Sequence, residues 1–506
     1  MSELRPAIFL DRDGTLIRDA GHISDYSQVE FFPETFPALK ELQKGYLLFV
    51  VSNQSGIARG IITREQADEV NRKMDRELRS RGIEIQEWYV CPHRREDRCR
   101  CMKPGPEFLL RAAADHGADL SRSFMLGDHP HDALTGREEG VYGLYLLSGH
   151  GGKHLAGLPA DHPVFHGIAE AAEWILKFPH PREDLERLIR QGAEDLKAGK
   201  TVAFPTETVY GLGADAFNPR AVDRIYAVKK RPRNNPLIVH ISHRRQLARV
   251  AARVPEKAEA LMEAFWPGPL TMVFPKQPEV PAGVTAGSDT VAVRMPVHPV
   301  ALRLIELAGT PVAAPSANAF GCTSPTTARH VFEQLGEECG LIIDGGACRV
   351  GVESTVITFL EEVPKILRPG GITREAIEQV IGPVAVREGE AKGALESPGL
   401  LPSHYAPDTP LYMLDHVPGP GETDEHTGLI LLSPPTGPLP GVVEILSESG
   451  DLSEAATNLY RAVRRLDALG LRRILTHRFP GSGLGAAIND RLEKACADKK
   501  GLNPRN

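Results

Sequence analysis

The sequence predicts an α/β protein: an N-terminal doubly wound domain, a central domain with a twisted sheet and a small C-terminal α/β domain. Two observations lead to this fold class. Short apolar runs of strand character alternate with segments of helical periodicity, a pattern typical of parallel sheets. The chain has 506 residues, and at roughly 150 residues per domain this length suggests about three cores.

Composition and charge exclude several classes of protein. Apolar residues make up 42% of the chain and charged residues 25%, as in soluble globular proteins. Because no apolar run approaches the ~20 residues of a membrane-spanning helix and no signal region opens the sequence, we expect a cytoplasmic protein without membrane association. The net charge of −7 disfavours broad nucleic-acid coating.

The N-terminal region places polar side chains after three predicted strands, residues 7–10, 47–51 and 124–126. Between them, a capping-box pattern at Thr63 and Gln66 begins a helix that Gly82 ends. Carboxyl ends of parallel strands meet at one edge of a sheet, where open α/β sheets commonly bind ligands. The side chains that follow the three strands are those of Asp11 and Asp13, Ser52 and Asn53, and Asp128.

These residue types suit phosphoryl transfer. One carboxylate of the Asp11 and Asp13 pair can attack phosphorus and form an aspartyl phosphate, while the other protonates the leaving oxygen. Asp128 would complete an oxygen cage for Mg²⁺. Ser52 and Lys103 would hold phosphoryl oxygens. The sequence D-x-D-G-T after an apolar strand, followed by Ser, Lys-Pro and G-D-x-x-x-D, therefore predicts a phosphatase.

With these motifs, residues 6 to about 150 resemble the haloacid dehalogenase superfamily, in the branch of the heptose-bisphosphate and histidinol phosphatases. The resemblance implies that Asp11 is the nucleophile and Asp13 the general acid and base, and that Asp11, Asp13 and Asp128 are the magnesium ligands. It also matches residues 52–55 and Lys103 to phosphate binding. Residues 53–60 are more similar to the heptose enzymes, which favours a heptose bisphosphate as substrate.

Two details keep other substrates open. Five residues separate the Cys91 and His93 pair from the Cys99 and Cys101 pair, a short spacer that is typical of histidinol phosphatases. Histidinol phosphate or another small phosphate ester is therefore the alternative substrate. Met102 stands where the family usually has arginine, which removes one cationic contact to the substrate.

Three of the seven cysteines lie close together in the same region. Cys91, Cys99 and Cys101 cluster while the other four are scattered, which favours a metal site over a disulfide framework. Three thiolates and the imidazole of His93 suit tetrahedral Zn²⁺. The resemblance implies a structural zinc loop that shapes the substrate entrance.

Beyond residue 148 the pattern loosens into Gly, His and Pro. The histidine-rich residues 149–154 have no accompanying thiolates or carboxylates, so we expect a solvated loop. A predicted helix at 168–178 closes the first domain, and Pro179-His180-Pro181 marks a boundary. The predicted organisation is a phosphatase domain at 1–180, a second domain at 181–388, a linker at 389–410 and an accessory domain at 411–506.

The second domain repeats the placement of polar residues at strand ends. A predicted strand at 201–204 leads into Pro205-Thr206-Glu207-Thr208 and a glycine-containing loop. Later strand ends add hydroxyl groups and Arg294, and a basic run at 229–231 ends an apparent helix. We expect these segments to converge on one polar pocket.

Together and in this order, the motifs resemble the threonylcarbamoyl-adenylate synthase family over residues 185 to about 385. That family joins L-threonine, bicarbonate and ATP into threonylcarbamoyl-AMP and pyrophosphate, for threonylcarbamoyladenosine in tRNA. The resemblance implies a threonine site at Thr208, His240, Arg294, Ser354 and the backbone near Ala314. The residues that it implies around ATP are Lys229, Arg231, Asn235, Thr290, Ser316, Ser324 and Arg368.

The chemistry of these side chains agrees with such substrates. Arg294 can bind an amino-acid carboxylate with two hydrogen bonds, and Lys229, Arg231 and Arg368 offer cations to the phosphates of ATP. No residue has the character of a covalent nucleophile. Catalysis would rest on positioning and on charge stabilisation by Arg, Lys and Mg²⁺.

The remainder of the chain extends this resemblance to about residue 500. Residues 397–407 resemble the linker of the longer synthases, which folds over the active site, so Tyr405 is a predicted lid residue that meets ATP. Leu401 and Ser403 replace basic residues usual there, while Lys230 replaces a usual glycine and Phe320 a usual polar residue. The G-x-G at 483–485 lacks the remaining features of a dinucleotide site.

The predicted partners are L-threonine, bicarbonate, ATP, a small sugar phosphate or phosphate ester, and downstream tRNA-modifying transferase proteins. No stable nucleic-acid binding is required. A second hypothesis of another class is that the central domain is a nucleotide- or RNA-binding regulatory module without catalysis.

Overall fold

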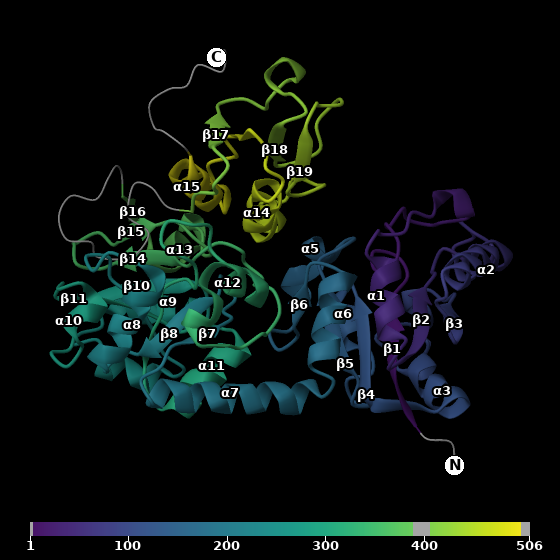
Figure 1. Ribbon diagram of the computed structural model, residues 1–506, viewed down its shortest axis with the longest axis horizontal. Coiled ribbons are helices and arrows are strands. Elements are labelled where there is room, and N and C mark those ends of the chain that lie inside the picture. The colour runs from purple at the N-terminus through teal and green to yellow at the C-terminus, as the bar shows by residue number, and fades with distance from the viewer. Residues whose placement is uncertain (1–3, 388–404, 497–506) are drawn as a thin grey trace. The chain divides into compact units, whose positions relative to one another are not determined.

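The computed structural model describes residues 4–387 and 405–496 (Figure 1). The chain divides into two compact units, Met1–Leu185 and Glu186–Asn506, and both contain helices and sheets. Within the described ranges, no helix has the combination of length and apolar character that crossing a bilayer requires. Leu401 and Ser403 of the predicted linker lie outside the described residues.

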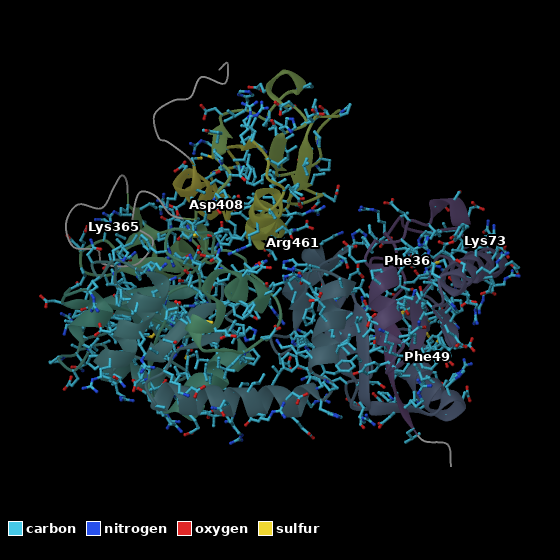
Figure 2. All side chains as sticks on the ribbon, in the orientation of Figure 1. Phe36, Phe49, Lys73, Lys365, Asp408 and Arg461 are labelled. Carbon is cyan, nitrogen blue, oxygen red and sulfur yellow. The ribbon has the colours of Figure 1, made fainter. Side chains whose placement is uncertain are left out.

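A six-stranded parallel sheet forms the centre of the N-terminal unit, in the order β3-β2-β1-β4-β5-β6. Its strands are β1 (Arg5–Leu10), β2 (Leu47–Asn53), β3 (Glu87–Cys91), β4 (Ala118–Gly127), β5 (Tyr142–Leu146) and β6 (Val164–Phe165). The strand order reverses between β1 and β4, and ligands bind at such a point in open sheets. Phe49 of β2, labelled in Figure 2, lies in the core of this unit. Its ring stacks on that of Phe9 of β1, with centroids 5.3 Å apart.

The helices of this unit are α1 (Thr35–Leu42), α2 (Arg64–Ser80), α3 (Glu107–His116), α4 (Pro130–Leu134), α5 (Gly151–His154) and α6 (Ile168–Lys177). The capping box predicted for α2 is confirmed. The Thr63 hydroxyl accepts a hydrogen bond from the Gln66 N–H at 3.2 Å, and the Gln66 side chain accepts one from the Thr63 N–H at 2.8 Å. Gly82 follows the helix with φ 75°, a conformation that glycine adopts without steric cost.

The C-terminal unit contains a ten-stranded mixed sheet, in the order β13-β7-β8-β12-β9-β11-β10-β14-β15-β16. Its strands are β7 (Val202–Phe204), β8 (Gly211–Asp215), β9 (Ile238–His240), β10 (Leu270–Pro275), β11 (Thr290–Arg294), β12 (Val312–Ala313), β13 (Leu341–Ile342), β14 (Thr355–Thr358), β15 (Lys365–Arg368) and β16 (Ala385–Val386). Seven helices accompany the sheet in the sequence: α7 (Pro181–Lys197), α8 (Pro219–Lys229), α9 (Glu256–Phe265), α10 (Ala282–Thr285), α11 (Pro299–Ala308), α12 (Ala328–Leu335) and α13 (Arg374–Ile381).

Lys230, which stands where the resemblance leads us to expect glycine, has an unusual backbone conformation. α8 ends at Lys229, and Lys230 follows with φ 51° in the left-handed region. Glycine is favoured at this position after a helix because it has no Cβ to clash. This backbone setting accounts for the glycine that the resemblance leads us to expect at the position of Lys230.

A four-stranded parallel sheet, in the order β17-β20-β18-β19, ends the unit. Its elements are β17 (Leu411–Leu414), β18 (Thr427–Leu431), β19 (Val442–Ile445), β20 (Arg473–His477), α14 (Leu452–Asp467) and α15 (Gly485–Ala495). Asp451 caps α14 as its position in the sequence indicates, accepting from the Glu454 N–H at 2.8 Å. In Figure 1, α14 and α15 lie between this small sheet and the larger sheet of the same unit.

Candidate active sites

A polar pocket lies beside the strand ends of the N-terminal sheet. Its lining includes five of the predicted residues: Asp11, Asp13, Asn53, Lys103 and Asp128. Ser52 lies beneath this lining, where it is buried and accepts a hydrogen bond from Gln54 at 2.8 Å. Gln54 of the predicted phosphate segment and Asp132 of the G-D-x-x-x-D motif also line the pocket, although neither was given a role of its own. Lining side chains without any prediction are those of Asp19, His22, Arg95, His129, His131, His150 and His154.

Asp11, Lys103 and Asp132 form a buried charged group at the centre of this pocket. The Lys103 ammonium lies 2.5 Å from Asp11 Oδ1 and 2.6 Å from Asp132 Oδ1. Burial raises the pKa of Asp11 to about 7, although Lys103 acts in the opposite direction. Ligand oxygens of Asp11, Asp128 and Asp132 all lie within 4.8 Å of one another. One ammonium does not neutralise three carboxylates, so this set fits a divalent cation such as Mg²⁺.

Asp13 is oriented by different partners. Its carboxylate accepts hydrogen bonds from Arg12 at 3.0 and 3.1 Å and from Gln54 at 2.8 Å. Arg12 is fully buried and is itself fixed by Asn71 at 2.9 Å. Asp13 lines the same pocket but does not belong to the group of three carboxylates, so its role as a metal ligand stays a prediction.

The predicted zinc ligands come together at the end of β3. The Sγ atoms of Cys91, Cys99 and Cys101 lie 3.4 to 3.6 Å from one another. His93 Nδ1 lies 3.2 Å from Cys101 Sγ and 3.7 Å from Cys91 Sγ. Four nitrogen and sulfur atoms at these separations can surround one tetrahedral ion, so the residues fit Zn²⁺.

The prediction of a solvated loop at 149–154 is only partly right: residues 149, 150 and 153 are exposed, but residues 151–154 are helical. Residues 151–154 form α5, and the backbone N–H of His150 donates to Asp128 Oδ2 at 2.7 Å. Gly149 lies so close to Asp128 and Gly14 that a Cβ would come within 2.3 Å of the Asp128 carboxylate. The glycines that suggested a loop instead allow this close packing against the predicted metal site.

A second pocket lies in the C-terminal unit. It brings together all five predicted threonine contacts: Thr208, His240, Arg294, Ala314 and Ser354. It is also lined by four of the eight residues predicted around ATP: Arg231, Ser316, Arg368 and Tyr405. The expectation that separate strand ends converge on one polar pocket is therefore confirmed.

Arg294, at the end of β11, is one of three buried arginines that line this pocket, with Arg231 and Arg368. Its guanidinium lies 2.6 Å from Glu207 Oε1 and donates to the Thr208 hydroxyl at 2.8 Å. Burial, together with the charge of Arg294, lowers the pKa of His240 to about 3, so this imidazole is neutral at physiological pH. The sequence showed Glu207 between two threonines but gave no sign that it pairs with Arg294.

Arg368 and Ser354 form a second polar group of the pocket. The Arg368 guanidinium donates to the Ser354 carbonyl at 2.9 Å and to its hydroxyl at 3.2 Å. The Ser354 hydroxyl also lies 2.7 Å from that of Thr271. These bonds fix the orientation of two residues that the sequence assigns to different substrates.

The other four residues predicted around ATP do not line the pocket. Lys229 is buried and donates to the carbonyls of Ser316, at 2.6 Å, and Asn318. Asn235 is fully buried, Thr290 pairs with Ser288 at 2.9 Å, and Ser324 donates to Glu353 at 2.6 Å. Their roles toward ATP stay predictions.

Three family descriptions match the chain. Residues 194–370 match the family described as "Telomere recombination", and residues 372–497 match the C-terminal domain of threonylcarbamoyl-AMP synthase. Residues 100–171 match the HAD-hydrolase-like family.

Individual relatives cover the two parts of the chain separately. The chain is 44% identical over 328 residues to the threonylcarbamoyl-AMP synthase of Pyrococcus abyssi. This alignment covers 62% of this chain and 96% of the relative. The chain is 41% identical over 141 residues to D-glycero-beta-D-manno-heptose-1,7-bisphosphate 7-phosphatase of Pasteurella multocida, covering 26% of this chain and 77% of the relative. A crystal structure of P. abyssi Sua5 complexed with L-threonine has a TM-score of 0.57 at 44% identity, over 61% of this chain and 93% of that chain.

Proposed function

The chain belongs to the threonylcarbamoyl-AMP synthase family, with a HAD-like phosphatase fused ahead of the synthase, and from this membership we propose a bifunctional enzyme. The C-terminal unit converts L-threonine, bicarbonate and ATP into threonylcarbamoyl-AMP and pyrophosphate. The N-terminal unit hydrolyses a phosphomonoester. The observation that carries the synthase proposal is the single pocket that contains all five predicted threonine contacts.

In the synthase, Arg294 and the neutral His240 are proposed to hold threonine. A guanidinium can bind a carboxylate with two hydrogen bonds. Arg294 lines the pocket, where it donates to the Thr208 hydroxyl, and it is held by the buried Glu207 carboxylate. The threonine amino nitrogen bonds to the carbon of bicarbonate and water leaves, which gives a carbamate. A carbamate oxygen then attacks the α-phosphorus of ATP, and the bond to pyrophosphate breaks. Arg231 and Arg368 would stabilise the charge that moves onto the phosphates.

In the phosphatase, Asp11 is proposed to attack phosphorus and Asp13 to protonate the leaving oxygen. The hydrogen bonds from Arg12 and Gln54 hold Asp13 in a fixed orientation for this proton transfer. Asp11, Asp128 and Asp132 would hold Mg²⁺, which when bound offsets the repulsion between carboxylates and phosphate. We propose a heptose bisphosphate as the substrate because of the similarity to the heptose enzymes, with histidinol phosphate as the alternative.

The synthase proposal is tested by pyrophosphate release from ATP in the presence of Mg²⁺. We expect release to require both L-threonine and bicarbonate, each omitted in turn. If ATP or RNA binds but no threonine-dependent release occurs, the central domain is a binding module and the enzyme proposal is wrong.

The phosphatase substrate is tested by phosphate release from heptose 1,7-bisphosphate, histidinol phosphate and a panel of small phosphate esters, compared side by side. We expect the highest kcat/KM for the heptose bisphosphate. A preference for histidinol phosphate would contradict this assignment while leaving the phosphatase chemistry intact.

Zinc binding is tested by removing one ligand. Cys101→Ser is expected to lower the zinc content from about one ion per chain and to lower the melting temperature of the N-terminal unit, because a structural zinc site contributes directly to folding. Metal analysis and calorimetry measure the two effects. The matched control is Cys496→Ser, which changes a cysteine outside the cluster. An unchanged zinc content in Cys101→Ser would contradict the proposed site.

The remaining assignments complete the proposal. We propose cytoplasmic residence, transfer of the product to downstream tRNA-modifying transferase proteins, and the domain boundaries given by the sequence. α7 begins at Pro181, where the second domain is predicted to start. The division between the two compact units falls inside this helix, after Leu185.

A further inference from the structure

The small C-terminal domain reaches the synthase pocket through a buried polar network centred on Glu353, which lines the pocket just before β14. Its carboxylate accepts hydrogen bonds from three distant parts of the chain. Ser324 donates at 2.6 Å, Tyr460 of α14 at 3.0 Å and Arg491 of α15 at 2.6 Å. Two helices of the C-terminal domain (Figure 1) therefore bind directly to one wall of the pocket.

Arg491 is the main cation beside the Glu353 carboxylate. Its side chain is 1% exposed, and it also forms an ion pair with Asp490 at 2.5 Å. Burial by itself disfavours the Glu353 carboxylate, but Arg491 and then Arg368 lower its pKa to about 2. A buried carboxylate without its cation is strongly unfavourable. Glu353 thus depends on the C-terminal domain for its charged state.

The network continues from Glu353 to the proposed substrate contacts. Ser354 is the next residue, and its carbonyl and hydroxyl both accept hydrogen bonds from Arg368. Arg368 and Ser354 line the same pocket as Glu353. A displacement of Glu353 would therefore displace one proposed threonine contact and one proposed ATP contact.

Tyr405, which also lines the pocket, contacts Tyr460 and Arg491 through its aromatic ring. The Tyr405 ring stacks on that of Tyr460, with centroids 5.9 Å apart and an interplanar angle of 26°. The Arg491 guanidinium carbon lies 5.3 Å from the centroid of the Tyr405 ring, within the range of a cation–π contact. The same two residues of the C-terminal domain thus contact both Glu353 and the predicted lid residue.

A backbone contact fixes the helix that carries Tyr460. Gly351 lies two residues before Glu353, and a Cβ at this position would come within 2.3 Å of the Ala456 carbonyl oxygen. The Thr457 hydroxyl donates to the Arg349 carbonyl at 2.7 Å in the same region. α14 therefore packs directly on the segment that leads to Glu353.

We propose that Arg491 and Tyr460 are positioning residues of the synthase: they hold Glu353, and through it Ser354 and Arg368, in the arrangement that binds threonine and ATP. The C-terminal domain is then a structural part of the substrate site. This inference rests on the proposed synthase function.

The test uses the full chain and measures KM and kcat separately for pyrophosphate release. Arg491→Met is expected to raise the KM values for threonine and ATP by about tenfold or more. Arg491→Lys keeps a cation and is expected to recover part of this loss. Tyr460→Phe removes one hydroxyl but keeps the stacked ring, so we expect a smaller increase in the same KM values.

Two controls separate positioning from folding. Arg478→Met removes an exposed ion pair with Glu493 in the same domain and is expected to leave both KM values unchanged. Phosphatase activity of the N-terminal unit reports the amount of intact chain in each preparation. A merely structural role would lower the melting temperature or the fraction of active enzyme, and with it the apparent kcat, without changing KM.

The outcomes are distinguishable. Wild-type KM values in both Arg491→Met and Tyr460→Phe would overturn the inference, and if Arg491→Met fails to fold, Tyr460→Phe alone decides. Absence of turnover in the wild-type chain contradicts the proposed function instead. In that case calorimetric titration of ATP and of threonine still compares the affinities of wild type and variants, and equal affinities overturn the positioning role.

Discussion

Asp11→Asn is expected to abolish phosphate release by the N-terminal unit, lowering kcat by more than about a thousandfold. An amide cannot attack phosphorus to form the acyl phosphate, while its shape is close to that of the carboxylate. Lys103, which contacts Asp11 at 2.5 Å, keeps its second carboxylate partner in Asp132 at 2.6 Å. The loss should therefore be chemical rather than structural, as phosphate release and thermal unfolding measured together would show.

The synthase activity of the same chain is an internal control for Asp11→Asn, and we expect it to be unchanged. The matched variant is Asp68→Asn, which removes an exposed carboxylate paired with Arg64 on α2 and should leave both activities intact. Retention of phosphatase activity in Asp11→Asn would show that the nucleophile has been misassigned.

Arg294→Ala is expected to reduce kcat/KM for threonine by about a hundredfold or more, because a buried charged contact to the substrate is lost. The variant also leaves the Glu207 carboxylate, 2.6 Å from Arg294 in the wild type, buried without its cation. Such a loss destabilises proteins by about 3–5 kcal/mol. Kinetics with threonine as the varied substrate and calorimetric unfolding measure the two effects separately.

A double variant separates threonine binding from stability. Arg294→Met combined with Glu207→Gln removes both charges, so stability should recover relative to Arg294→Ala while threonine use does not. Arg374→Ala, which removes only an exposed pair with Glu378, is the control for a simple loss of positive charge. An unchanged KM for threonine in the double variant would contradict the assignment of Arg294.

Much of the fold could be predicted because its signals are local. The capping box of Thr63 and Gln66 lies within four consecutive residues, and its two hydrogen bonds form as expected. The apolar runs that became β1, β2 and β4 are each followed by polar residues, so the edge of the sheet that carries the site was also predictable.

The errors and omissions involve contacts between residues far apart in the sequence. Glu353 and Arg491 are 138 positions apart, and the residues next to them in the sequence do not indicate that they form a contact. The glycines at 149–152 look like a flexible loop, yet at Gly149 the absence of a side chain allows close packing against Asp128. The contacts of Lys229 with the carbonyls of Ser316 and Asn318 likewise depend on how the end of α8 meets the loop after β12.

The apolar core of the C-terminal domain has a consequence for cooperativity. Val209, in the loop between β7 and β8, and Val352, beside Glu353, belong to the same apolar cluster as Leu459 of α14 and Ile488 of α15. Residues packed in one core tend to open together as one cooperative unit. We therefore expect damage to the core beneath the small sheet to loosen Val209, which lines the substrate pocket, and to lower synthase activity even where every substrate contact is intact.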